Sequence, residues 1–333
     1  MKNWIARLFG GDDAAASHTP VPAAAPVPQA PAQAPGQAPL DHGQAYWRWL
    51  TAGAAAAAPT AQAQRHSQLV LVELDRLLDA PDHAADLVPR VPEVIPQLLR
   101  SLRDEAASSA ELARQVARDP SLVAELIREA NSPYYRSSSQ VRTIDAALLV
   151  LGRNGLRMLL ARAAFRPLIG IQNGRHSRQA APRIWRHTEQ CALAASLLAP
   201  GLNAEPFEAY LAGLMDDLGV IVALRLFDGV LEADALPQDP AVVAGLLART
   251  RTLAARIALQ WELPPPIAAA ILGAQGEGPS ASQPLAMTLG RAERLASLRL
   301  LLDAGMLDAG DQAVAGLDAA STRVLERLAP ADL

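Results

Sequence analysis

The sequence of 333 residues has few of the residues that mark membrane proteins, disulfide-bonded proteins or β-sheet proteins. No apolar run reaches the ~20 residues that a membrane-spanning helix needs, and no secretory signal follows the first residues. Cys191 is the single cysteine, which excludes internal disulfides and fits a reducing compartment. Aromatic residues make up only 4%, whereas Ala and Leu dominate a hydrophobic content of 50%. The sequence therefore predicts an all-α, cytoplasmic protein.

Lysine is also almost absent, so the abundance of arginine largely reflects the composition of the chain. The net charge is −4, but residues 136–186 contain ten arginines against one acid. A basic stretch of this kind has the alternative interpretation of a nucleic-acid surface, and Gly152 between two helical runs resembles the turn of a helix-turn-helix. However, Arg153, Arg157 and Arg162 lie among Leu and Ala on a helix that must pack, which favours a solvated face. We therefore expect no nucleic-acid partner.

Composition divides the chain into four parts. Residues 1–13 carry aromatic and aliphatic side chains at helical spacing, and this short amphipathic segment is a candidate for peripheral membrane contact through residues 1–10. Residues 14–40 contain seven prolines and are expected to form a disordered Ala/Pro-rich linker. We predict a helical appendage over residues 41–85 and a helical domain over residues 86–333.

Boundary signals predict several short helices in the second half of the chain. Asp119 is a candidate N-cap with Pro120 at the first helical position, and Asn131 and Ser132 end that helix. Gly152 is expected to end the next helix, because glycine readily adopts the left-handed conformation found at helix C-termini.

Two further predictions concern the helices that follow. Thr143 is a candidate N-cap, and Pro182 is expected to start a later helix, since proline is favoured in the first turn. No segment alternates polar and apolar residues with a period of two, so no sheet is predicted.

An acidic pair, Asp216 and Asp217, lies in the run AYLAGLMDDLGVIVALRLF at residues 209–227, which we predict as one continuous apolar helix. Neighbouring residues point about 100° apart on a helix, so the two carboxylates face different stripes. Asp217 shares the stripe of bulky side chains. Asp216 shares a row of small residues, including Gly213 and Gly219, that allows another backbone to come close. Because burying a carboxylate is costly unless it is paired or protonated, each acid needs a partner or a metal.

Five motifs, in order along the chain, resemble those of a known family. They are RDPSLVAELIREANSPYY, TIDAALLVLG, IWRHTEQCALAASLLA, GLMDDLG and WELPPPIAAAI, and they add Trp185, Trp261 and Pro264 to the motif residues named above. Together they resemble the HDOD family, helical relatives of the HD-type metal-dependent phosphohydrolases. The resemblance covers roughly residues 88–289 and implies a compact multi-helix HDOD/HD-like bundle, which helices within residues 287–328 would complete.

The resemblance also implies a former metal site. His187 matches the first ligand histidine and Asp217 matches the aspartate of the His-Asp pair, whereas Asp216 stands in place of that pair's histidine. The regions where HD relatives have further histidines, RTRTLAARIALQWELP and IAAAILGAQG, contain none. Because a transition metal needs three or more converging ligands, we expect vestigial positions with no metal, cofactor or catalytic residue. Magnesium held by Asp216, Asp217 and water is the alternative. We predict that His187 and Asp217 contact each other.

Other residues carry weaker signals. Cys191 lacks the neighbouring groups that activate a nucleophile and is expected to pack as an apolar residue. The sequence GRNG at residues 152–155 is too short for a phosphate-binding loop.

The resemblance to the HDOD family implies a non-catalytic bacterial signal-transduction module that binds an unidentified protein partner or small regulator. The alternative is a residual metal-dependent phosphohydrolase acting on a nucleotide or phosphoester.

Overall fold

The protein is described by a computed structural model over residues 40–51, 61–79, 114, 116–117, 120–131, 140–170, 172–229, 236–274 and 283–329. These residues belong to one compact unit that begins at Leu40. The predictions for residues 1–39, for the cap Asp119 and for Ser132 lie outside the described residues.

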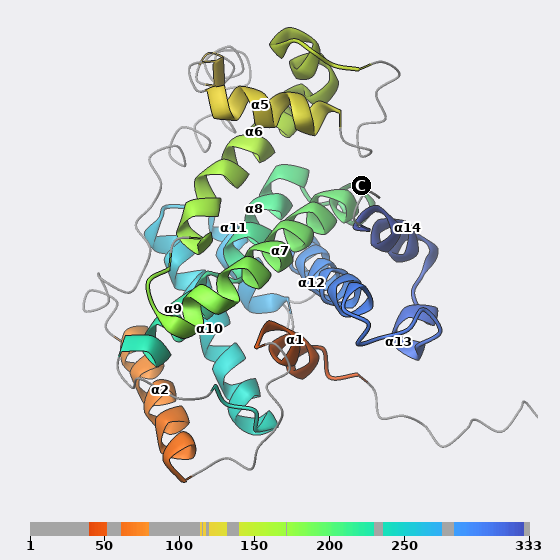
Figure 1. Ribbon diagram of the computed structural model, residues 1–333. Coiled ribbons are helices and arrows are strands. Elements are labelled where there is room, and N and C mark those ends of the chain that lie inside the picture. The colour runs from red at the N-terminus through yellow and green to blue at the C-terminus, as the bar shows by residue number, and fades with distance from the viewer. Residues whose placement is uncertain are drawn as a thin grey trace, which may run out of the picture. The chain divides into compact units, whose positions relative to one another are not determined.

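Every regular element among the described residues is a helix, which confirms the all-α prediction (Figure 1). The helices are α1 (His42–Leu50), α2 (Ala61–Asp79), α5 (Pro120–Ala130), α6 (Ile144–Gly170), α7 (Arg175–Leu198), the 3-10 turn η3 (Ala199–Leu202), α8 (Pro206–Asp216), α9 (Leu218–Gly229), α10 (Pro240–Gln260), α11 (Pro265–Gly273), α12 (Pro284–Asp303), α13 (Gln312–Ala315) and α14 (Ala319–Arg327). None of them is both long and apolar enough to cross a bilayer.

The boundaries of α5 and α6 follow the local signals. Pro120 is the first residue of α5, and Asn131 follows its end. The Asn131 side chain donates to the carbonyls of Ile127 and Val141, both at 2.8 Å, and accepts from the Val141 amide, so it joins the end of α5 to the segment before α6. Thr143 Oγ1 accepts from the Ala146 amide as an N-cap.

Gly152 divides α6 into two helical stretches. Its φ of +62° lies in the region that side-chain-bearing residues rarely adopt, and the first stretch ends at this glycine as predicted. Its ψ of −170° lies outside the left-handed helical region, so the left-handed conformation expected at this helix end is wrong. The second stretch leads to Phe165, whose ring packs edge-on against Trp261 with the centroids 5.8 Å apart. Trp185 is half-buried on α7, and Pro264 directly precedes α11.

The N-terminus of α7 differs from the prediction. The helix begins at Arg175 and continues through Pro182, so the expectation that Pro182 starts it is wrong. The cause is a distant cap: the Asp228 carboxylate at the end of α9 accepts from the amides of His176 (2.7 Å) and Ser177 (2.9 Å). A side chain supplied by another helix therefore fixes the start of α7 earlier than the local sequence indicates.

The predicted continuous helix over residues 209–227 is also wrong, because the chain breaks at the acidic pair. Asp216 is the last residue of α8, Asp217 is its C-cap with ψ of −2°, and α9 begins at the next residue. The Asp217 carbonyl accepts instead from the amides of Val220 and Ile221, at 3.0 and 3.3 Å.

The small residues around the acidic pair do allow close approach, as predicted. A Cβ at Gly213 would lie 2.6 Å from the backbone of Ala192 on α7, and a Cβ at Gly219 would lie 1.9 Å from the carbonyl oxygen of Thr250 on α10. The chain therefore brings α7 and α10 up to α8 and α9, and α12 packs along α7 and α8 (Figure 1). These helices surround the acidic pair.

Two arginines of α6, Arg157 and Arg162, contact other helices of the unit. Arg157 is only 5% exposed and its guanidinium lies over the ring of Phe207 at 5.8 Å. Arg162 pairs with Glu189 at 2.6 Å and with Glu129 at 3.2 Å. The interpretation as a solvated face is therefore wrong for Arg157, which is buried. Arg153 and Arg162 are partly exposed, and Arg162 joins α5 to α7.

Candidate functional site

Asp217 is the centre of a hydrogen-bond network that joins three parts of the chain. Its Oδ2 lies 2.8 Å from Nδ1 of His187 and accepts a hydrogen bond of 2.8 Å from the Thr188 hydroxyl, both on α7. Its Oδ1 accepts from the phenol of Tyr46 on α1, at 2.9 Å. The predicted contact between His187 and Asp217 is confirmed, and both oxygens of the carboxylate are engaged.

His187 and Asp217 each favour the charged form of the other, although burial opposes both charges. Burial opposes ionisation of Asp217, but His187 and the three hydrogen bonds outweigh it, so the pKa of Asp217 lies below its ordinary value. Burial likewise opposes the imidazolium, yet the charge and hydrogen bond of Asp217 raise the pKa of His187, with a contribution from Glu293. The other ring nitrogen, Nε2, lies 3.3 Å from the Ser297 hydroxyl on α12.

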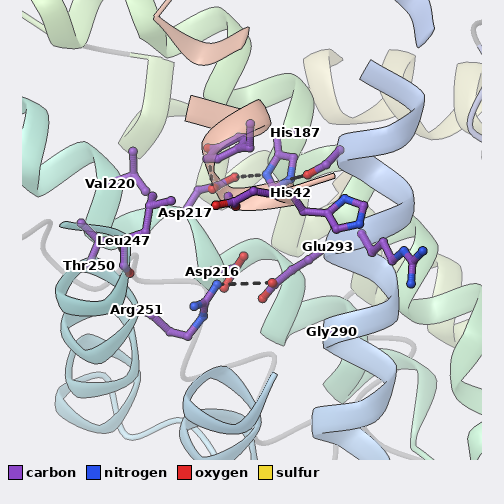
Figure 2. A pocket seen from close by; sticks show the side chains of 15 residues that line it. His42, His187, Asp216, Asp217, Val220, Leu247, Thr250, Arg251, Gly290 and Glu293 are labelled. Atoms are coloured by element: carbon purple, nitrogen blue, oxygen red, sulfur yellow. Dashed lines mark hydrogen bonds and ion pairs between the residues drawn. The ribbon is translucent and has the colours of Figure 1, made fainter. Parts of the chain in front are cut away.

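Asp216 belongs to a second, separate group. Burial raises the pKa of Asp216 well above its ordinary value, and Glu293, which is hydrogen-bonded to it, raises it further. Glu293 on α12 also accepts from Nη2 of Arg251 on α10, at 3.3 Å. Figure 2 shows Arg251 beside Asp216 and facing Glu293.

Arg251 supplies the positive charge of this second group. Burial opposes its charged form, but Glu293, Asp216 and Asp217 raise the pKa of Arg251. Its side chain is 18% exposed and that of Glu293 is 8% exposed, so water screens the pair only weakly. The Arg251 guanidinium therefore places a positive charge, supplied by the protein itself, among three carboxyl groups.

The two groups line one pocket of about 300 Å³. Its wall is formed by Asp41, His42, Gly43, Tyr46, His187, Asp216, Asp217, Val220, Leu247, Thr250, Arg251, Gly290, Glu293, Arg294 and Ser297 (Figure 2). Arg294 is exposed and His42 is half-buried, and burial followed by the charge of Arg294 lowers the pKa of His42. The pocket thus has charged walls of both signs and contains the three residues predicted as vestigial metal positions.

The donor set does not fit a divalent metal. Both oxygens of Asp217 and both ring nitrogens of His187 already have side-chain neighbours within the network, and Arg251 places a cation next to Asp216. Within the part of the chain that the structure describes, no group of three or more His, Cys, Asp or Glu side chains is arranged to hold a metal.

Sequence reasoning missed Tyr46, Arg251 and Glu293. A signal existed for two of them: YWRWL at residues 46–50 is rich in aromatics in a chain with 4% aromatic residues, and Glu293 is an acid within the otherwise mostly apolar α12. Cys191 is fully buried, and burial raises its thiol pKa well above the ordinary value, so the thiol is not an activated nucleophile.

The HDOD domain matches residues 88–275, more than half of the chain. The chain belongs to the HDOD domain family. No curated protein matches the sequence.

Two solved structures share the HDOD fold with this chain. A candidate metal-dependent phosphohydrolase from Shewanella amazonensis SB2B is 17% identical, with a TM-score of 0.56, and the match covers 79% of this chain and 99% of that one. An HDOD domain protein of unknown function from Geobacter sulfurreducens is 21% identical, with a TM-score of 0.53, and the match covers 77% and 98% of the two chains. At these identities the likeness establishes the fold alone.

Proposed function

We propose that this HDOD protein is a non-catalytic regulatory module of bacterial signal transduction, which binds a protein partner or a small regulator. The observation that carries the proposal is that the positions matching HD metal ligands are engaged with other side chains of the protein. Asp217 is bonded to His187, Thr188 and Tyr46, and Asp216 is grouped with Arg251 and Glu293.

A metal-activated water needs a metal with an open coordination position. Here the side chains that would bind the metal stabilise one another instead, and the Arg251 guanidinium opposes a second cation by charge repulsion. Family relatives include a candidate metal-dependent phosphohydrolase, so residual phosphoester hydrolysis is the second function to be tested.

Metal content and hydrolysis distinguish the two functions. The purified full-length protein is analysed for bound metals, titrated calorimetrically with Mg²⁺ and Mn²⁺, and assayed with bis(4-nitrophenyl) phosphate in both metals. We expect no stoichiometric metal, no binding heat and no more hydrolysis than the Asp217→Asn variant gives. Metal-dependent hydrolysis by the unchanged protein that Asp217→Asn lacks, at a temperature where circular dichroism shows the variant still folded, would establish the phosphohydrolase and overturn the proposal.

Binding through the pocket requires a separate measurement. The exposed Arg294 lines the pocket, whereas the exposed Arg256 on α10 does not. Arg294→Ala and the matched control Arg256→Ala are compared with the unchanged protein in co-purification from the native bacterium. A partner kept by the control and lost by Arg294→Ala supports regulation through the pocket. A partner that both variants retain contradicts that location.

A further inference from the structure

The pocket receives one wall from α1, which precedes the family match at residue 88. Tyr46 enters from this helix: its hydroxyl bonds to Asp217 at 2.9 Å, and its ring lies 4.4 Å from the imidazole of His187, centroid to centroid. Tyr46 is 7% exposed, and Asp217 is its hydrogen-bond acceptor. The Tyr46 side chain therefore contacts both Asp217 and His187 from a helix outside the matched residues, as a bound ligand would.

A second set of contacts attaches α1 to the segment before α10. The indole of Trp47, which is fully buried, donates to the carbonyl of Pro237 at 2.7 Å. Gln44 donates to the carbonyl of Gln238 at 3.2 Å, and the Gln238 amide donates to the Thr51 hydroxyl at 3.3 Å. These contacts resemble peptide recognition, in which main-chain hydrogen bonds add affinity and aromatic anchors add specificity.

The length of α1 shows why docking matters for its structure. A helix of nine residues is marginal in water, because nucleation costs more than so few hydrogen bonds return. Asp41 caps the helix through the Gln44 amide at 3.0 Å, but this adds only about 1 kcal/mol. The helical form of α1 therefore depends mainly on the surface that it contacts.

We propose that the surface of the HDOD domain that carries Asp217 and the segment before α10 is a peptide-docking site whose ligand is the chain's own α1, with Tyr46 as the anchor and Trp47 as the second contact. The helix covers this surface in cis, where it forms one wall of the pocket, and it opens as a unit, so a peptide of the same sequence competes for the same surface. The proposal goes beyond the function above and does not depend on whether the pocket is catalytic. A partner protein that competes with α1 for this surface presents an amphipathic helix with adjacent Tyr and Trp residues.

Mass action makes the proposal testable on the full chain. An added peptide binds only the fraction of molecules whose own α1 has opened, so its apparent Kd is the intrinsic Kd divided by that fraction. Weakening α1 in the protein must therefore tighten binding of the peptide. Fixing α1 in place must abolish binding.

The experiment uses a fluorescent peptide of residues 40–51 and measures anisotropy with four full-length proteins. They are the unchanged chain, Tyr46→Phe, Trp47→Phe, and Thr51→Cys/Gln238→Cys joined by a short thiol cross-linker. Cys191 is fully buried and is not expected to react with the linker. Tyr46→Phe keeps the ring and removes only the hydroxyl, so it is the variant least able to disturb folding.

The expected result is that the peptide binds Tyr46→Phe about tenfold more tightly than the unchanged chain, since a hydrogen bond to a charged group is lost from the competing α1. Trp47→Phe should act in the same direction, and the cross-linked protein should not bind. A peptide carrying Phe at the Tyr46 position should bind Tyr46→Phe about tenfold more weakly than the unaltered peptide. Equal binding to the cross-linked and unlinked double-cysteine proteins, or no binding to any of the four proteins, would overturn the proposal.

Discussion

The imidazole of His187 lies 2.8 Å from the carboxylate of Asp217, although 30 positions separate the two residues in the chain. Each side chain is about 4% exposed, so the attraction acts with little screening by water. Tyr46 and Thr188 satisfy further lone pairs of the carboxylate. The arrangement stabilises the fold only while each member is present, because a buried charge without its counterpart is costly.

Removal of the Asp217 charge should destabilise the protein strongly. Asp217→Asn leaves His187 buried without its counter-ion, which we expect to cost about 3–5 kcal/mol in the free energy of unfolding. The matched control is Asp75→Asn, because Asp75 makes a two-bond pair with Arg249 on the surface. Breaking that exposed pair should cost less than about 1 kcal/mol. Urea denaturation measures the free energy of unfolding of both variants. Equal losses in Asp217→Asn and Asp75→Asn would contradict the assigned role of the buried His187–Asp217 pair.

The stabilisation that the His187–Asp217 pair contributes should decrease both at low pH and at high pH. The pKa of Asp217 is lowered, so its stabilisation is present above the ordinary value of 3.8 and is lost as pH falls through the folded pKa. The pKa of His187 is raised, so its stabilisation is present below 6.5 and is lost as pH rises through the folded pKa. The stability gap between the unchanged protein and Asp217→Asn should therefore be widest in between. A constant gap from pH 3 to 9 would argue against an ion pair.

Between mildly acidic and neutral pH, the contribution of Asp216 to the free energy of unfolding should decrease as pH rises, which is the opposite of the Asp217 contribution. Its pKa is raised by burial and Glu293, so the folded protein retains a proton that the unfolded chain releases above about 3.8. The stability that Asp216 contributes is complete below that value and decreases as pH rises toward the folded pKa. In Asp216→Asn this decrease should be absent. Thermal unfolding across pH 4–8 checks it, and parallel pH curves for the two proteins would disprove the prediction.

Arg251 and Glu293 should be coupled in a double-mutant cycle. Arg251→Met removes the cation beside Glu293 and should cost about 3–5 kcal/mol, because Glu293 then stays buried without it. Adding Glu293→Gln removes the remaining charge, so the double variant should recover part of the loss. A coupling of about 0.5–3 kcal/mol is expected from denaturation of the four proteins. Additive losses would show that the two side chains act independently.

Gly219 should tolerate no side chain. A Cβ there would lie 1.9 Å from the carbonyl oxygen of Thr250, so Gly219→Ala must push α9 away from α10. We expect a loss of about 1–3 kcal/mol, which is typical of overpacking. Gly201→Ala is the control, since a Cβ at Gly201 has no neighbouring heavy atom within 4 Å. The two midpoints of thermal unfolding should differ by several degrees, and similar midpoints would contradict the close approach.

Local signals along the chain predicted much of the fold. Pro120, Thr143 and Gly152 act at helix boundaries through their own backbone or a cap three residues away, so the sequence alone reveals them. The start of α7 and the break at Asp217 were not predicted. The start of α7 depends on Asp228, 52 positions from the His176 amide that it caps. Helical periodicity is insensitive to a single residue whose ψ departs from the helix, as at Asp217.

The candidate site was predicted only in part, for a related reason. The family motif identified His187 and Asp217, and their required pairing followed from the cost of burying a charge. Tyr46, Arg251 and Glu293 come from three other helices, and no motif or spacing in the sequence links them. Their roles depend on which helix faces come together, which is a property of tertiary packing.

The position of Glu293 on α12 matters when the protein is shortened for experiment. The family match ends at residue 275, before α12 begins, and it starts after α1. A fragment cut at the limits of that match would lose Glu293, the acceptor of Arg251, and Tyr46, a donor to Asp217. Such a fragment would expose both buried charges to water, and its behaviour would describe a different pocket from the one in the whole protein.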